Sequence, residues 1–154
     1  MKHIEINSNS WLSLIEEINN TYNPGDIILH EWLKDRFHLQ KPRFKDYYNE
    51  DDFIRGVGLY NLDYLTLIDT LREQLLKDCK ICLRSIRNEG YSIIPPKEQV
   101  KYGYDIFIKE LKSLIKKIYA IMNNVRPVSA TQRAIANDKI ARFSLIKQML
   151  SGLK

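Results

Sequence analysis

The chain lacks long hydrophobic runs, internal repeats and low-complexity segments. No window of about 18 uninterrupted apolar residues occurs, so we expect no membrane span. The first ten residues, MKHIEINSNS, lack the apolar core of a signal peptide. We therefore expect a cytoplasmic protein.

Cysteine is scarce, and the two cysteines, Cys79 and Cys82, form a single C-x-x-C motif. No second motif of this kind and no nearby histidine pair completes a zinc site. On a strand, this spacing would also place the two thiols on opposite faces. We expect reduced cysteines and no metal.

Motifs for catalysis are also missing. Residues 30–34, HEWLK, begin like the helix of a zinc protease, but Lys34 stands where the second histidine is required. Residues 55–58, RGVG, lack the remaining glycine and lysine of a phosphate loop. The acidic run at 50–52 could bind a cation, although such runs are more often solvated loops. We expect no enzymatic activity and no cofactor.

Charge is present but unevenly distributed. Residues 1–96 hold 12 basic and 15 acidic residues, whereas residues 97–154 hold 12 basic and 4 acidic ones. The C-terminal part could meet an anionic surface, neutralise the acidic first part, or present a solvated lysine face.

The most informative segment is 61–96, which predicts a helix followed by a β-hairpin. The helix has an apolar stripe, made of Leu62, Leu65, Ile68, Leu71 and Leu75, and should end at residues 77–78. Two β-type runs, 79–83 and 91–94, flank residues 84–90. Prolines 95 and 96 stop the second run.

The first 60 residues predict helix, strand, helix. Ser10 is a natural N-cap for a helix whose apolar residues are Trp11, Leu14, Ile15 and Ile18. A turn at 23–25 precedes a β-type run at 26–29 and a second helix at 30–37. Residues 40–60 are harder to interpret, and residues 52–58 could add a helical turn or two.

Segment 71–91 resembles the C-terminal DNA-binding domain of OmpR/PhoB-type response regulators. Leu71 and Arg72 match the pair near the end of that family's recognition helix, and residues 86–91, IRNEGY, match its wing. The match departs at Asn88, where the family usually has glycine, but asparagine tolerates positive φ. The chain's short, lysine- and asparagine-rich character also resembles small winged-helix proteins encoded by phages.

The resemblance implies a winged helix at 8–96. Together with a helical hairpin extension at 97–154, which the spacing of apolar residues predicts, we expect a mainly α protein with a small β-hairpin, an α+β class. The implied function is sequence-specific binding of double-stranded DNA by a transcriptional regulator, located in the host cytoplasm if phage-encoded. Candidate DNA contacts lie on the helix and on the wing: Asn61, Tyr64, Thr66, Thr70 and Arg72, then Lys80 near the wing's base and Arg84 and Arg87 at its tip.

Three carboxylates, Asp63, Asp69 and Glu73, lie on the same helix, and their negative charges would repel the phosphates of DNA. They favour the alternative function, an interaction protein that uses the same fold to bind or inhibit a host protein.

The C-terminal part carries a heptad seam: Val100, Tyr104, Phe107, Leu111, Leu114, Ile118, Ile121 and Val125. Residues 123–127 break it, and Ser129 or Thr131 can cap a last helix that ends at Gly152. That helix carries Ile135, Ile140, Phe143, Ile146, Met149 and Leu150. Folding back as a hairpin would bury part of the seam, and we expect a homodimer through residues 97–154 to bury the rest.

Overall fold

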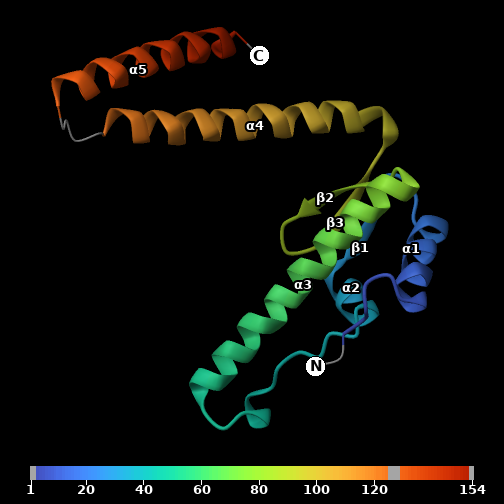
Figure 1. Cartoon of the computed structure of the whole chain (residues 1–154). Coiled ribbons are helices and arrows are strands. Elements are labelled where there is room, and N and C mark those ends of the chain that lie inside the picture. The colour runs from blue at the N-terminus through green and yellow to red at the C-terminus, as the bar shows by residue number, and fades with distance from the viewer. Residues whose placement is uncertain (1–2, 125–128, 153–154) are drawn as a thin grey trace. The chain divides into compact units, whose positions relative to one another are not determined.

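The computed structural model describes residues 3–124 and 129–152, apart from the side chains of Ala130 and Ser151. It is mainly helical with one small three-stranded antiparallel sheet, which agrees with the expected α+β class (Figure 1). The elements are α1 (Asn9–Thr21), β1 (Ile27–Leu29), α2 (His30–Arg36), the short 3-10 helix η1 (Phe44–Asp46), α3 (Glu50–Cys79), β2 (Cys82–Ile86), β3 (Gly90–Ile94), α4 (Pro96–Asn123) and α5 (Ala130–Ser151).

The chain divides into two compact units, Met1–Gln99 and Val100–Lys154, and helix α4 crosses the boundary. Among the described residues, no helix is both long and apolar enough to cross a membrane.

The sheet lies in the first unit, with strand order β1-β3-β2. Tyr91 pairs with Ile28 on one side, and Ile93 pairs with Leu83 on the other. These four side chains are buried in one core with Phe37, which follows α2, and with side chains from the helices: Trp11, Leu14, Ile18, Leu33, Tyr64, Leu67, Ile68, Leu71 and Leu75. The three strands are thus stabilised by burying one face of the sheet.

Helix α1 begins earlier in the sequence than expected. Its N-cap is Ser8, whose hydroxyl accepts from the backbone N–H of Trp11 at 3.2 Å, so the prediction of Ser10 is wrong. The buried residues of α1 include Trp11, as predicted. The indole N–H of Trp11 donates to Gln74 Oε1, which ties α1 to α3.

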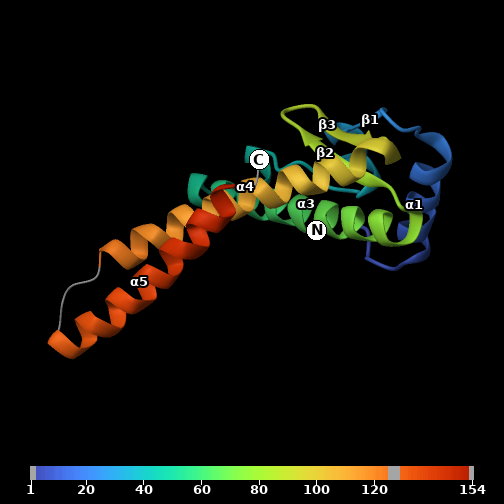
Figure 2. The same cartoon turned by 90° about the horizontal axis from the view of Figure 1, so that it is seen from above.

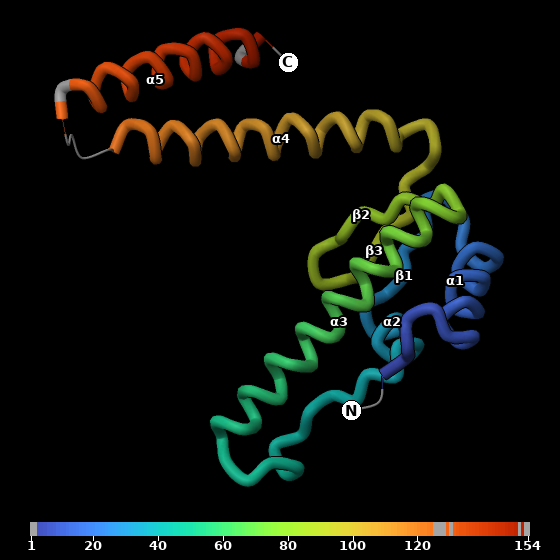
Figure 3. Tube along the Cα trace, viewed as in Figure 1, coloured from blue at the N-terminus to red at the C-terminus, as the bar shows by residue number. Residues whose placement is uncertain are grey.

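Helix α3 is one continuous helix of 30 residues, longer than the sequence predicted (Figure 3). The side chain of Asn49 caps it by accepting from the N–H of Asp52 at 2.8 Å. The acidic run at 50–52 is therefore its first turn, where carboxylates favourably face the positive end of the helix dipole. The helix ends at Cys79, with Lys80 in the left-handed region at φ 61°. The prediction of a strand beginning at Cys79 is wrong.

The buried stripe of α3 also differs from the prediction in its first half. Ile68, Leu71 and Leu75 are buried as expected, but Leu62 and Leu65 are 58% and 54% exposed. The buried positions there are Gly56, Tyr60, Tyr64 and Leu67. The reason is the helical period: at about 100° per residue, Leu62 lies about 180° and Leu65 about 120° around the helix from Leu71.

In the second unit, α5 runs back beside α4 as the expected helical hairpin (Figures 1 and 2). The ammonium of Lys147 lies 4.3 Å from the centroid of the Tyr119 ring, and Ser129 caps α5. The half-buried apolar residues of α4 between 108 and 122 are Ile108, Leu111, Ile115, Ile118 and Met122. Other members of the predicted seam are exposed: Val100, Tyr104, Phe107, Leu114 and Ile121. Val125 and residues 126–127 lie outside the described residues.

Gly90 provides a stability test of the sheet. A Cβ there would overlap the carbonyl oxygen of Ile28, because β1 and β3 approach closely at this point. Gly90→Ala should therefore lower the free energy of unfolding by about 1–3 kcal/mol. Gly58→Ala is the control: it lies in α3 with nothing near the added methyl, and should raise stability by about 0.5–1 kcal/mol. Urea denaturation of both variants measures this. Equal midpoints for the two would contradict the sheet packing.

Candidate nucleic-acid interface

The hairpin that joins β2 to β3 turns over residues 87–89. Asn88 has φ 63°, so asparagine adopts the left-handed conformation that the sequence required of it. The N–H of Glu89 donates to the carbonyl of Ile86 at 3.2 Å, and the N–H of His30 donates to the carbonyl of Glu89 at 3.0 Å. The turn is thus hydrogen-bonded both within itself and to the start of α2.

The basic side chains of this hairpin are exposed. Arg87 lies in the turn, as predicted. Arg84 lies within β2, opposite Ser92, so its placement at the tip is wrong, although its side chain is exposed. Lys80 is exposed after α3, and its ammonium donates to the carbonyl of Lys77 at 2.6 Å. The side chains of Arg84 and Arg87 remain available to an anionic partner.

The candidate contacts on α3 are mostly engaged within the protein. The hydroxyl of Thr66 donates to the carbonyl of Leu62, and that of Thr70 donates to the carbonyl of Thr66, both at 2.9 Å. Asn61 is exposed at the rim of a pocket. Neither threonine hydroxyl offers a free donor to a base edge.

Tyr64, a candidate DNA contact, lies on the buried face of α3 and not on its exposed face as a contact would require. Its hydroxyl lies 2.6 Å from Nδ1 of His30, within hydrogen-bond distance, and its ring meets the His30 ring edge-on. Burial raises the pKa of Tyr64 well above its ordinary value. The tyrosine joins α3 to α2 and does not face solvent.

Arg72 faces the hairpin. Its guanidinium lies over the ring of Tyr91 at 5.6 Å and reaches Asp69 at 3.3 Å. Its Nε is buried and, within the described part of the chain, has no hydrogen-bond partner. Tyr91 is buried. Arg72 therefore stabilises the contact between α3 and β3.

The outward face of α3 is apolar and acidic, a feature that the sequence reasoning missed. Leu62, Leu65 and Leu76 are about half exposed, and Asp69 and Glu73 are exposed beside them. The signal in the sequence was the excess of leucines, which is more than one helix face needs.

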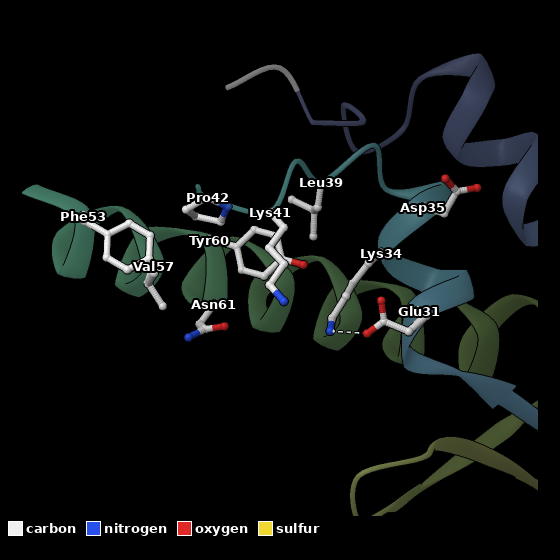
Figure 4. A pocket seen from close by; sticks show the side chains of 10 residues that line it. All are labelled: Glu31, Lys34, Asp35, Leu39, Lys41, Pro42, Phe53, Val57, Tyr60 and Asn61. Atoms are coloured by element: carbon white, nitrogen blue, oxygen red, sulfur yellow. Dashed lines mark hydrogen bonds and ion pairs between the residues drawn. The ribbon is translucent and has the colours of Figure 1, made fainter. Parts of the chain in front are cut away.

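Two surface pockets lie near the first half of α3. One, of about 440 Å³, lies between α2, the segment after it and α3 (Figure 4). Its lining contains two acidic and two basic residues, so the net charge is zero. Lys34 forms a salt bridge with Glu31 at 2.9 Å. The other, of about 480 Å³, is lined by Asp46, Tyr47, Tyr48, Asp52, Arg55, Gly56, Leu59 and Asp63. Neither has an excess of positive charge that would suit a phosphate.

The cysteines are both free and half-buried. Cys79 ends α3 and Cys82 begins β2, so they do not share a strand as predicted. Burial raises the pKa of the Cys82 thiol, which favours its protonated form. No group of three potential metal ligands occurs within residues 3–124 and 129–152.

No family model, no curated protein and no solved structure matches the chain. Of the eight predicted contact residues, those with exposed side chains are Asn61, Thr66, Lys80, Arg84 and Arg87.

The burial of His30 against Tyr64 predicts that the stability of the fold depends on pH. Burial, and then the nearby charge of Lys34, lowers the pKa of His30 below its ordinary value. Because the unfolded chain then binds more protons below about pH 6.5, stability should fall as the pH drops through that range and level off below the folded-state pKa. Thermal melts from about pH 7.5 to about pH 5 measure this fall, which should be smaller in His30→Asn. His38→Asn is the control, since His38 is exposed at a positive φ that suits asparagine. A fall of unchanged size in His30→Asn would exclude His30 as its source.

Proposed function

We propose that the chain binds double-stranded DNA, and that residues 8–96 form a winged helix whose hairpin makes the main contact. The observation that carries this proposal is the exposure of Arg84 and Arg87 on a well-defined β-hairpin. The order of elements also supports it: helix, strand, two helices and hairpin is the order that the resemblance implies. Guanidinium groups suit phosphate oxygens or a narrow minor groove.

Local charge supports contact around the hairpin. Within the first unit, residues 77–99 contain five basic and three acidic residues, although residues 1–96 are acidic as a whole. In the second unit, Lys109, Lys112 and Lys116 are exposed and lie three and four positions apart, so they share one face of α4. Each unit thus offers a basic surface to the phosphates.

Helix α3 supports base recognition less well. Tyr64 is buried, Arg72 is engaged with Tyr91, and the outward face carries leucines and carboxylates. We therefore assign the contact to the hairpin and expect recognition of backbone and groove shape rather than base reading by α3. The transcriptional role that the resemblance implies is proposed together with this binding.

The test is a titration of duplex DNA at several salt concentrations. Arg84→Ala plus Arg87→Ala should weaken binding and flatten the log–log salt slope by about 0.9 for each phosphate that is no longer bound. Arg43→Ala plus Lys45→Ala is the control, because it removes two exposed basic side chains from another part of the first unit and should leave the slope unchanged. Equal slopes for wild type and the hairpin variant, with both folded, would falsify the assignment to the hairpin.

A second candidate function is binding of a protein partner, favoured by the outward face of α3. Three half-exposed leucines beside Asp69 and Glu73 suit an apolar groove with a basic rim. Asp46, Asp52 and Asp63, which line the pocket of about 480 Å³, extend this acidic surface.

Photo-crosslinking tests this candidate in cells that express the full chain. A photoreactive residue at Leu65, on the outward face, should yield a discrete adduct with another protein. The same residue at Leu12 is the control, since Leu12 is equally exposed but lies on α1. An adduct pattern at Leu65 that matches the control would argue against a protein-binding face.

A further inference from the structure

Helix α4 has two apolar stripes, and the hairpin with α5 covers only one. The uncovered stripe, here called the α4 ridge, consists of Val100, Phe107, Leu114 and Ile121. Their side chains are 84%, 52%, 53% and 63% exposed. Each member lies seven positions after the previous one, which is the repeat of helices that wind around one another.

Two opposite charges border the middle of this ridge. Glu110 and Lys117 lie three residues after Phe107 and Leu114, respectively, and are also seven residues apart. They line a shallow depression of about 460 Å³, together with Phe107, Leu111, Ser113 and Leu114. The ridge is thus grooved at its midpoint and carries one charge of each sign beside the groove.

Helix α5 extends the apolar surface. Its exposed residues Ile135, Ile146 and Met149 lie on one side of its half-buried stripe, which contains Ala136, Ile140, Phe143 and Leu150. A helix turns by about 100° per residue. Viewed along the chain direction, the exposed stripe lies on the same rotational side of the half-buried stripe in α4 and in α5. Helices α4 and α5 run antiparallel (Figure 2). The same sense of rotation therefore places both exposed stripes on the same face of the hairpin.

We propose that a second copy of this chain docks on the α4 ridge. The two α4 helices lie antiparallel about a two-fold axis near residues 113–114, so Glu110 of each copy faces Lys117 of the partner subunit. A two-fold axis makes every contact twice, so the complementary charges pair on both sides of the midpoint. In a parallel pair in register, the two-fold axis would instead place Glu110 and Lys117 of the two copies on opposite edges of the contact, where they could not pair.

This arrangement also explains where the lysines lie. Lys109, Lys112 and Lys116 are on the side of α4 away from the ridge, by the same rotation of about 100° per residue, so the dimer leaves them exposed. The inference rests on the second unit alone and stands whether or not the hairpin of the first unit binds DNA.

Sedimentation equilibrium of the full chain, without DNA, tests the ridge. Wild type should reach twice the mass of one chain at high concentration. Leu114→Glu should weaken the dimer by at least about 100-fold, because it buries a charge in the apolar contact. Leu145→Glu is the matched control: Leu145 is similarly exposed, at 61%, but lies on α5 off the ridge, and its variant should remain dimeric. A monomeric wild type, or a dimer unaffected by Leu114→Glu, would overturn the proposal.

The register is tested by reversing the charges, which lie on exposed side chains. Lys117→Glu places like charges together twice and should weaken the dimer by about tenfold. Adding Glu110→Lys restores both pairs and should recover the wild-type dissociation constant. If the double variant is no tighter than the single one, the antiparallel pairing is wrong. Circular dichroism confirms the helical content of each variant.

Discussion

The structure of the first unit depends on one contact, the burial of α3 against the inner face of the sheet. Ile68, Leu71 and Leu75 are fully buried there, and burying one such side chain stabilises the fold by about 1.5–3 kcal/mol. This contact sets the rotation of α3. The rotation brings Tyr64 inward to His30 and leaves Leu65 in solvent. The same burial that stabilises the fold therefore determines what α3 can offer to a partner.

The hairpin of the first unit depends on two local features that have different physical origins. Asn88 adopts a positive φ that closes the turn, whereas Gly90 allows β1 to approach β3. Together they order the hairpin that carries Arg84 in β2 and Arg87 in the turn. Its second strand, β3, is hydrogen-bonded to β1 on one side and to β2 on the other. An arginine fork on an ordered strand loses less conformational entropy on binding than one on a free loop. The basic hairpin and the acidic, leucine-bearing face of α3 are thus distinct surfaces of one unit, suited to different partners.

The organisation of the second unit follows from an apolar surface on α4 that is wider than the hairpin with α5 can bury. A two-helix hairpin buries one stripe on each helix, but α4 carries a second stripe from Val100 to Ile121. Large exposed apolar surfaces of this kind mark interaction sites in soluble proteins. The acidic–basic pair of Glu110 and Lys117 then favours one alignment of a partner helix over others. The helical hairpin and the proposed dimer therefore use two different apolar stripes of α4.

Local chemistry in the sequence alone determined the order of elements, the α+β class and the turn at Asn88, because periodicity, capping and turn residues act over a few positions. It also indicated a helical hairpin after residue 96. Tertiary packing decided the rest. The leucines of α3 are more numerous than its buried face can hold, and only the sheet's position shows that Tyr64, not Leu65, faces inward. A change of one position in a helix rotates a side chain by about 100°, which is enough to exchange a buried residue for an exposed one.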